Sequence, residues 1–205
     1  SYEEVISRYP LVSMQVARFI IERIRPSLSK RRLWARPGVV AVLPATRGVD
    51  VKGQVGRLLP DLEYHGSVIR VDAVAAREAL GAQVFADAIE GGSDEAAHTV
   101  AHWVDRIEAD HDMVVFVGDD DATPWSLYCQ RHADEVLLVA DANASTGDVV
   151  QLPPCESFIV GSVPIRAHRT LLLVYPEATE YPRETAAWLD RVQVDSHLHL
   201  RCGHG

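Results

Sequence analysis

The sequence predicts an α/β fold: a three-layer, mostly parallel sheet with helices on both faces, preceded by an N-terminal helix. One observation is a series of short, continuous apolar runs, which are typical of strands buried on both faces. A second is that amphipathic stretches separate these runs, as in consecutive βαβ units. A third is the composition: 47% of the 205 residues are hydrophobic and 24% are charged, which is ordinary for a globular protein and excludes a disordered chain.

The N-terminal part of the chain is distinct from the rest. Residues 1–28 are predicted to form a helix, because apolar residues recur with helical spacing from Val12 to Ile24 and Pro26 ends the pattern. Residues 29–38 are rich in cationic side chains and end in Pro37 and Gly38, which predicts a linker. The α/β domain is therefore expected to span residues 39–205.

Strands and helices alternate through that domain. Buried strands are predicted at residues 39–43, 67–71, 113–117, 135–140 and 170–175. Helices are predicted between them at residues 51–63, 74–89, 96–109, 125–132 and, less regularly, 155–165. Residues 196–201 alternate polar and apolar side chains with period two, which predicts an edge or exposed strand. The helical tryptophans Trp103, Trp125 and Trp188 are expected to pack helices onto the sheet.

Charge and cysteine content exclude several classes of protein. A formal net charge of −9 disfavours binding to nucleic acid or to an anionic bilayer, since both require a cationic surface. Cys129, Cys155 and Cys202 are too widely spaced to suggest a disulfide framework, so a cytoplasmic location is predicted. No apolar run approaches the roughly 20 residues of a membrane span. We interpret the chain as a soluble piece of a longer protein, because both ends read as cut.

The loop after the first strand is where a parallel sheet would hold a phosphate group. A P-loop requires closely spaced glycines followed by Gly-Lys-Ser/Thr, so that backbone N–H groups and the lysine surround the phosphates. Here Lys52 precedes Gly53, and no hydroxyl residue follows to hold magnesium. The sequence therefore predicts a degenerate P-loop NTPase-like or Rossmann-like scaffold that does not hydrolyse nucleotides.

The third strand ends in acidic residues, as a Walker B strand does. Asp119 begins a run of three carboxylates that could bind a divalent cation through oxygen ligands, and a solvated acidic loop is the alternative. With Lys52, Asp119 and Thr123 are the candidates for contact with a bound nucleotide, although no cofactor is predicted.

The C-terminal strand contains candidate metal ligands. His197 and His199 are two residues apart, so both project from one face of a strand, and Cys202 follows closely. A zinc site and a pair of interface histidines are both compatible with this spacing. No Gly-x-Ser-x-Gly nucleophile motif occurs, and the helical spacing of Cys129 and His132 is interpreted as coincidental, so no catalytic residue is assigned.

Several segments in the same order resemble the neuropathy target esterase family of patatin-like phospholipases. They are Thr123-Pro124-Trp125, Cys129 to Asp134, Val136-Leu137-Leu138-Val139-Ala140, Thr185-Ala186-Ala187-Trp188-Leu189 and Ser196-His197-Leu198-His199-Leu200-Arg201-Cys202. The resemblance covers roughly residues 37–205. The opening helix also looks like the closing helix of a cyclic-nucleotide-binding domain, with Arg8 to Pro10 similar to the turn found there.

The resemblance implies a position between upstream cyclic-nucleotide-binding domains and a downstream patatin domain. These two domains of the same parent chain are the implied partners. The catalytic dyad and the residues that hold a cyclic nucleotide would then lie outside these 205 residues. The implied function is a non-catalytic regulatory or scaffold segment of a lysophospholipase or serine esterase, whose membrane association the resemblance leaves open.

An alternative function remains open. The middle of the chain is also similar in layout to the partition and septum-site ATPases, most clearly at residues 133–139. On this hypothesis the domain is a nucleotide-binding switch that uses an atypical phosphate loop at residues 45–53. Phosphate binding there would require convergent backbone N–H groups at a helix N-terminus.

Overall fold

The computed structural model describes residues 38–89, 91–144, 148–150, 152, 158–160, 163–165, 167–181 and 184–202. The chain divides into two compact units, Ser1–Arg36 and Pro37–Gly205, and all the described residues belong to the second. The predicted N-terminal helix, and the predicted linker apart from Gly38, lie outside the described residues.

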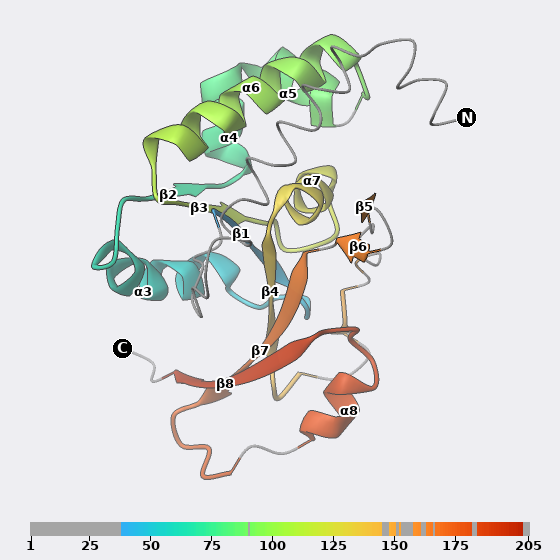
Figure 1. Cartoon of the computed structure of the whole chain (residues 1–205). Helices are drawn as coiled ribbons and strands as arrows, with labels where there is room; N and C mark the ends of the chain where they lie inside the picture. Colours follow the sequence, from blue (N-terminus) through green and yellow to red (C-terminus); the bar gives the residue numbers. More distant parts are fainter. Residues whose placement is uncertain are drawn as a thin grey trace. The chain divides into compact units, whose positions relative to one another are not determined.

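The domain is built on a six-stranded sheet in which every neighbouring pair of strands is parallel (Figure 1). Its order is β2-β3-β1-β4-β7-β8. The strands are β1 (Val39–Pro44), β2 (Val68–Val71), β3 (Met113–Val117), β4 (Glu135–Asp141), β7 (His168–Pro176) and β8 (Ser196–Cys202). The predicted parallel α/β sheet is confirmed, and β8 lies at an edge of the sheet as expected.

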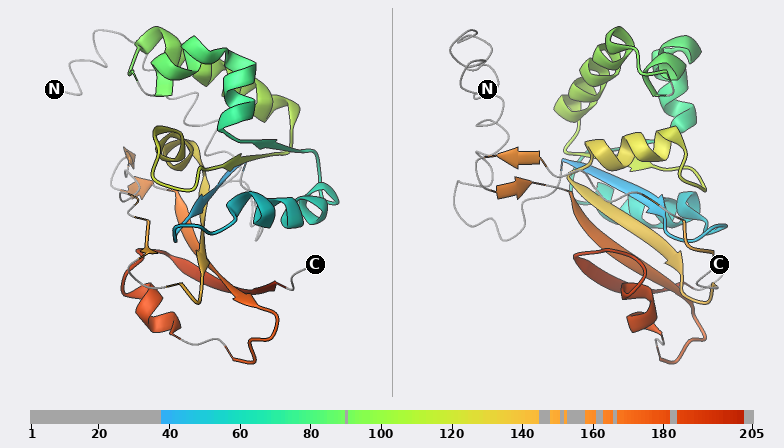
Figure 2. Two further views of the ribbon diagram at one scale, coloured as in Figure 1. Left: turned by 180° about the vertical axis from the view of Figure 1, so that it is seen from behind. Right: turned by 90° about the vertical axis from the view of Figure 1, so that its right-hand side faces the viewer.

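The helices lie on both faces of this sheet (Figures 1 and 2). They are α3 (Val51–Glu63), α4 (Ala73–Leu80), α5 (Ala82–Ile89), α6 (Asp94–Asp110), α7 (Pro124–His132) and α8 (Thr185–Leu189). Two hydrophobic clusters form the core, and alternate residues of a strand belong to different clusters, as Leu43 and Val42 of β1 do. Buried side chains of α4 to α8 join one cluster, whereas those of α3 join the other.

The direction of each crossover explains this distribution. Connections between parallel strands are almost always right-handed, so opposite directions along the sheet place the connecting helices on opposite faces. From β1 to β2, through α3, the chain moves toward the β2 edge of the sheet. In every later step between strands of this sheet it moves toward the β8 edge. The loops that follow the neighbouring strands β1 and β3 therefore lead to opposite faces, which makes the crevice between them the expected ligand position.

The second predicted helix is interrupted in the structure. Residues 74–89 were expected to be one helix, but Gly81 ends α4 with a φ of 84°, and α5 starts at the next residue. Such a positive φ favours glycine, because a side chain would be strained there. The two short helices pack against each other and against α6.

A helix near residues 155–165 was a wrong prediction. Phe158–Val160 (β5) and Val163–Ile165 (β6) form a two-stranded antiparallel sheet instead. Both segments consist mainly of β-branched and aromatic residues, which favour strands over helices. The other predicted strands and helices of the domain are confirmed, with ends that differ by one or two residues.

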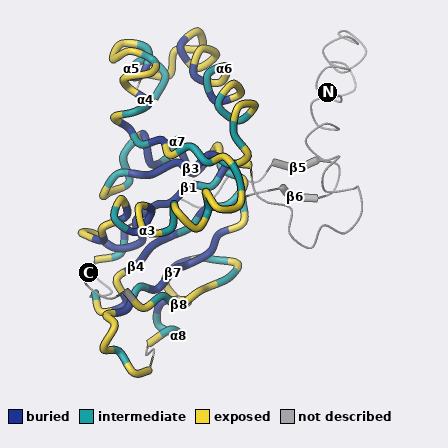
Figure 3. The backbone as a smooth tube through the Cα atoms, turned by 90° about the vertical axis from the view of Figure 1, so that its left-hand side faces the viewer, coloured by how far each residue is buried: buried dark blue, intermediate teal, exposed yellow. Residues whose placement is uncertain are grey.

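The buried residues follow the strands and the inward sides of the helices (Figure 3). Trp125 and Trp188 belong to the larger cluster, and Trp103 packs half-buried against it, so the predicted packing role of all three is confirmed. None of the described helices is long and apolar enough to cross a membrane.

Candidate functional site

The loop between β1 and α3 is tied to the chain that follows β4. The backbone N–H groups of Ala45 and Arg47 donate to the carbonyl oxygens of Val139 and Asp148, at 2.7 and 2.8 Å. Thr46 is fully buried, and its hydroxyl oxygen accepts from the Asp141 N–H at 3.0 Å. These backbone donors are used within the protein and do not converge on a shared anion position, as those of a P-loop do.

The N-terminus of α3 is capped by a side chain of the protein itself. Asp50 is the N-cap residue, and its Oδ1 accepts from the Gly53 N–H at 2.8 Å. A Cβ atom at position 53 would meet the Asp50 carboxylate, which would have to shift to make room for it. Free N–H groups at a helix N-terminus are what attract a phosphate, and here a carboxylate occupies that position.

Lys52 is exposed and acts on a different part of the domain. Its charge acts on Asp72, the N-cap residue of α4, which also pairs with Arg70 at 3.1 Å. Partial burial opposes ionisation of Asp72, but the Ala75 N–H, Arg70 and Lys52 outweigh it, so the pKa of this carboxyl is lowered. The structure thus places Lys52 near the end of β2.

Asp119 and Thr123 are brought together, as part of a helix cap. The Thr123 hydroxyl donates to Asp119 Oδ2 at 2.7 Å and accepts from the Ser126 N–H at 3.2 Å, which caps α7. The Ser126 hydroxyl is buried and accepts from the Asp119 N–H at 3.0 Å. These three side chains therefore satisfy one another where β3 passes into α7.

The acidic residues after β3 do not converge. Asp120 is exposed, and Asp121 pairs with Arg47 at 3.7 Å across the loops that follow β1 and β3. Both partners of this pair are largely exposed, so it contributes only about 0–1 kcal/mol. Within the described part of the chain, no group of three or more His, Cys, Asp or Glu side chains is arranged to hold a metal ion.

His197 and His199 lie together on one side of β8, as their spacing predicts. Their ring centroids are 5.5 Å apart, and His199 also stacks on Tyr175 at 5.6 Å. Burial, and next the charge of His197, lower the pKa of His199. The side chain of Cys202 is outside the described residues, so the three-residue metal site stays a prediction.

Cys129 and His132 have separate surroundings despite their spacing on α7. Cys129 is fully buried, and this burial, with the nearby Asp119 charge, raises the pKa of its thiol well above the ordinary value. His132 is exposed and stacks on Tyr128, with 4.1 Å between ring centroids. Such a thiol lacks the electropositive, accessible surroundings of a reactive cysteine.

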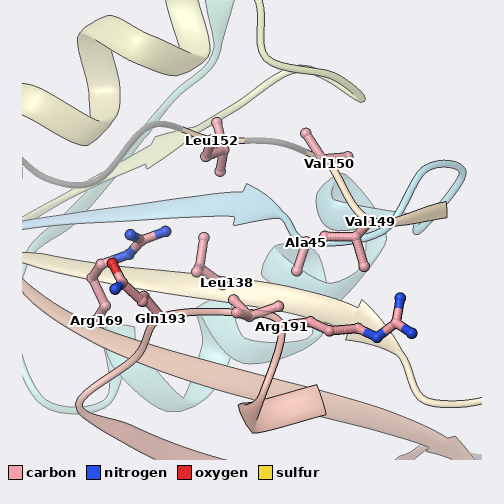
Figure 4. Close-up of a pocket in the computed structure, with 9 residues that line it drawn as sticks. Ala45, Leu138, Val149, Val150, Leu152, Arg169, Arg191 and Gln193 are labelled. Atoms are coloured by element: carbon pink, nitrogen blue, oxygen red, sulfur yellow. The ribbon is translucent and has the colours of Figure 1, made fainter. Parts of the chain in front are cut away.

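A pocket that the sequence did not indicate lies over β4 (Figure 4). Its volume is about 230 Å³, and its walls come from β4, β7, the segments around residues 45 and 150, and the chain after α8. Arg169, Arg191 and Gln193 line it together with apolar side chains. In the sequence Arg169 only precedes an apolar strand run, where a charged residue is usually exposed, and no local signal marks it as buried.

Comparisons with known proteins agree with this fold. The family model of the neuropathy target esterase family P-loop like domain matches residues 38–204. Neuropathy target esterase sws of Drosophila persimilis is 28% identical over 210 residues, which cover 95% of this chain and 14% of that protein. The Drosophila melanogaster protein of that name is 26% identical, again over 95% of this chain and 14% of its own length. The chain thus spans about one seventh of the length of these curated relatives.

Proposed function

The chain belongs to the neuropathy target esterase family, and on that premise we propose that residues 39–205 form its non-catalytic regulatory or scaffold segment. In the parent protein this segment links a cyclic-nucleotide-binding domain to a patatin hydrolase domain. The parent is a lysophospholipase or serine esterase whose catalytic residues lie outside this chain.

The observation that carries the proposal is the capped N-terminus of α3. A nucleotide-using relative of this fold would present free N–H groups and a lysine at that place. Here the Asp50 carboxylate fills the anion position, and Lys52 acts on Asp72 instead. The domain keeps the scaffold of a nucleotide-binding fold, while Asp50 and Lys52 interact with other groups of the domain and stabilise the fold.

A partly uncovered sheet face supports a scaffold role. The face of the sheet that α3 covers continues over β7 and β8. There Leu172 belongs to the hydrophobic cluster on the α3 side, and Val174 and Leu200 are partly buried and pack against this cluster. The main contacts of α3 with the sheet are to β1, β2 and β3. By strand alternation Leu198 lies on the same face, and it is 56% exposed. We propose that a neighbouring domain of the parent packs on this apolar strip.

Hydrolase activity of the intact parent tests this role. Leu198→Asp places a charge on the apolar strip, so we expect the kcat/KM for a lysophospholipid to fall by about fivefold or more, the lower end of typical coupling between sites. The matched control is Val74→Asp on α4, which is also exposed but lies on the opposite face, and we expect less than about a twofold change. Equal kinetics for both variants and the unchanged parent would reduce the domain to a passive spacer.

The alternative, a nucleotide-binding switch, is favoured by one observation: the loops after β1 and β3 flank the crevice where such folds bind ligands. Calorimetric titration of the chain with ATP, GTP and their diphosphates, in the presence of magnesium, separates the two functions. We expect no binding at millimolar ligand, either for the unchanged chain or for Asp50→Asn, which keeps the cap but removes its charge. Micromolar binding that Lys52→Ala abolishes would establish the switch.

A further inference from the structure

The pocket over β4 contains a buried cation without a hydrogen-bonding partner at its Nε atom. Arg169 is only 4% exposed, and its Nε is buried with no hydrogen-bond partner. The backbone of Arg169 donates to Asp195 Oδ2 at 2.9 Å and accepts from the Asp195 N–H at 2.8 Å. The backbone of Arg169 is therefore held in place, and its side chain is part of the pocket lining.

Such an arrangement is costly unless an anion completes it. A buried arginine is usually paired with a carboxylate or a phosphate, because a buried N–H donor that has no acceptor costs free energy. The Nε–H of Arg169 is such a donor. The planar guanidinium suits a carboxylate or phosphate, to which it can donate two parallel hydrogen bonds. An acceptor with two oxygens in the pocket would thus pair with a guanidinium whose Nε has no hydrogen-bond partner in the protein.

The rest of the lining limits what the ligand can be. Ala45, Leu138, Val149, Val150 and Val192 give the pocket an apolar wall. Its volume of about 230 Å³ is below the roughly 300–1,000 Å³ of sites for drug-sized ligands, which favours a smaller ligand. A small molecule with one anionic group and a compact apolar body matches both the size and the lining.

The two arginines have different positions in the pocket. In Figure 4 the Arg169 guanidinium lies toward one end of the lining and the Arg191 guanidinium toward the other. Arg191 is exposed and has an interaction partner within the protein, whereas Arg169 is buried. A single small anion that contacts the Arg169 guanidinium would not be held equally by both.

We propose that this pocket is a binding site for a small organic anion, a carboxylate or a phosphate monoester, with Arg169 as the anion-binding residue. The anionic oxygens accept hydrogen bonds from the Arg169 guanidinium, and the apolar body packs against Leu138, Val150 and Val192. The pocket lies over β4 rather than between β1 and β3, and it shares only Ala45 with the loop after β1.

Binding of defined probes to the chain tests the proposal. Hexanoate and phenyl phosphate serve as apolar anions, inorganic phosphate as an anion without an apolar body, and hexanamide as a neutral analogue of hexanoate. At constant ionic strength we expect saturable binding of hexanoate, phenyl phosphate or both, weaker binding of inorganic phosphate, and none of hexanamide. Absence of saturable binding for both apolar anions at millimolar concentration would overturn the proposal.

Matched variants locate the site. Arg169→Met keeps much of the side-chain volume without the charge, and we expect it to weaken binding by about tenfold or more. Arg191→Gln should change it by less than about threefold. If Arg169→Met does not fold, Arg169→Lys replaces it, since lysine keeps the charge but lacks the planar fork. Unchanged affinity in a folded Arg169 variant, or an equal loss in Arg191→Gln, would contradict the assignment.

Discussion

Replacing Trp125 with alanine is expected to lower the free energy of unfolding by about 4 kcal/mol. The indole is 2% exposed, and its Nε1–H donates to the Val117 carbonyl oxygen at 2.9 Å. Its ring contacts those of Phe85, Phe116 and Tyr128, with centroids 5.7 to 5.8 Å away. The substitution therefore leaves a large cavity and an unpaired carbonyl where α5, α7 and β3 meet.

Urea unfolding followed by far-UV circular dichroism measures this loss without depending on the fluorescence of the removed tryptophan. Trp125→Phe keeps an aromatic ring but lacks the indole donor, and we expect it to cost clearly less than alanine. Trp103→Ala is the control on α6, where the half-buried ring leaves a smaller cavity, and should cost about 1–2 kcal/mol. A loss below about 1 kcal/mol for Trp125→Ala would mean that α7 is not packed as described.

The local pattern of the sequence was sufficient to predict most helices and strands. The apolar run before Gly118 predicts β3, and the Thr123–Pro124 pair is typical of a helix N-terminus such as that of α7. The strand order could not be predicted in this way, because periodicity describes how one strand is buried and not which strand lies beside it. The β5 and β6 strands were missed because the periodicity of a short apolar segment does not distinguish a strand from a helix.

The candidate site was less predictable than the fold. Asp119 and Thr123 were both candidates for contact with a nucleotide, and the structure brings them together, but their shared use in the α7 cap depends on Ser126, which carries no motif. The reversed order of Lys52 and Gly53 indicated a departure from a P-loop, whereas the Asp50 cap emerged only with the geometry of α3. Arg169 was missed altogether, because its burial results from tertiary packing of chain segments far apart in the sequence.

Replacing Trp188 with alanine is expected to lower the free energy of unfolding by about 3–4 kcal/mol and to abolish ligand binding in the pocket. The α8 helix has five residues, its N-cap Glu184 has a positive φ of 62°, and no side chain caps it. So short a helix is not stable by itself. The Trp188 side chain, 1% exposed, packs into the larger core cluster and holds α8 against the sheet.

The pocket should be lost with the helix, because Trp188 also positions its lining. The Trp188 carbonyl oxygen accepts from the N–H groups of Arg191 and Val192 at 3.1 and 3.0 Å, and both residues line the pocket. Amide hydrogen exchange should therefore become faster throughout α8 and these two residues, while α7 stays protected. Leu189→Ala is the control on the same helix: this side chain is 38% exposed, so we expect a loss below about 1 kcal/mol and intact hexanoate binding. Similar amide exchange rates and similar hexanoate affinities in the two variants would show that the pocket wall does not depend on Trp188. Binding of the anion would then have to rest on Arg169 alone.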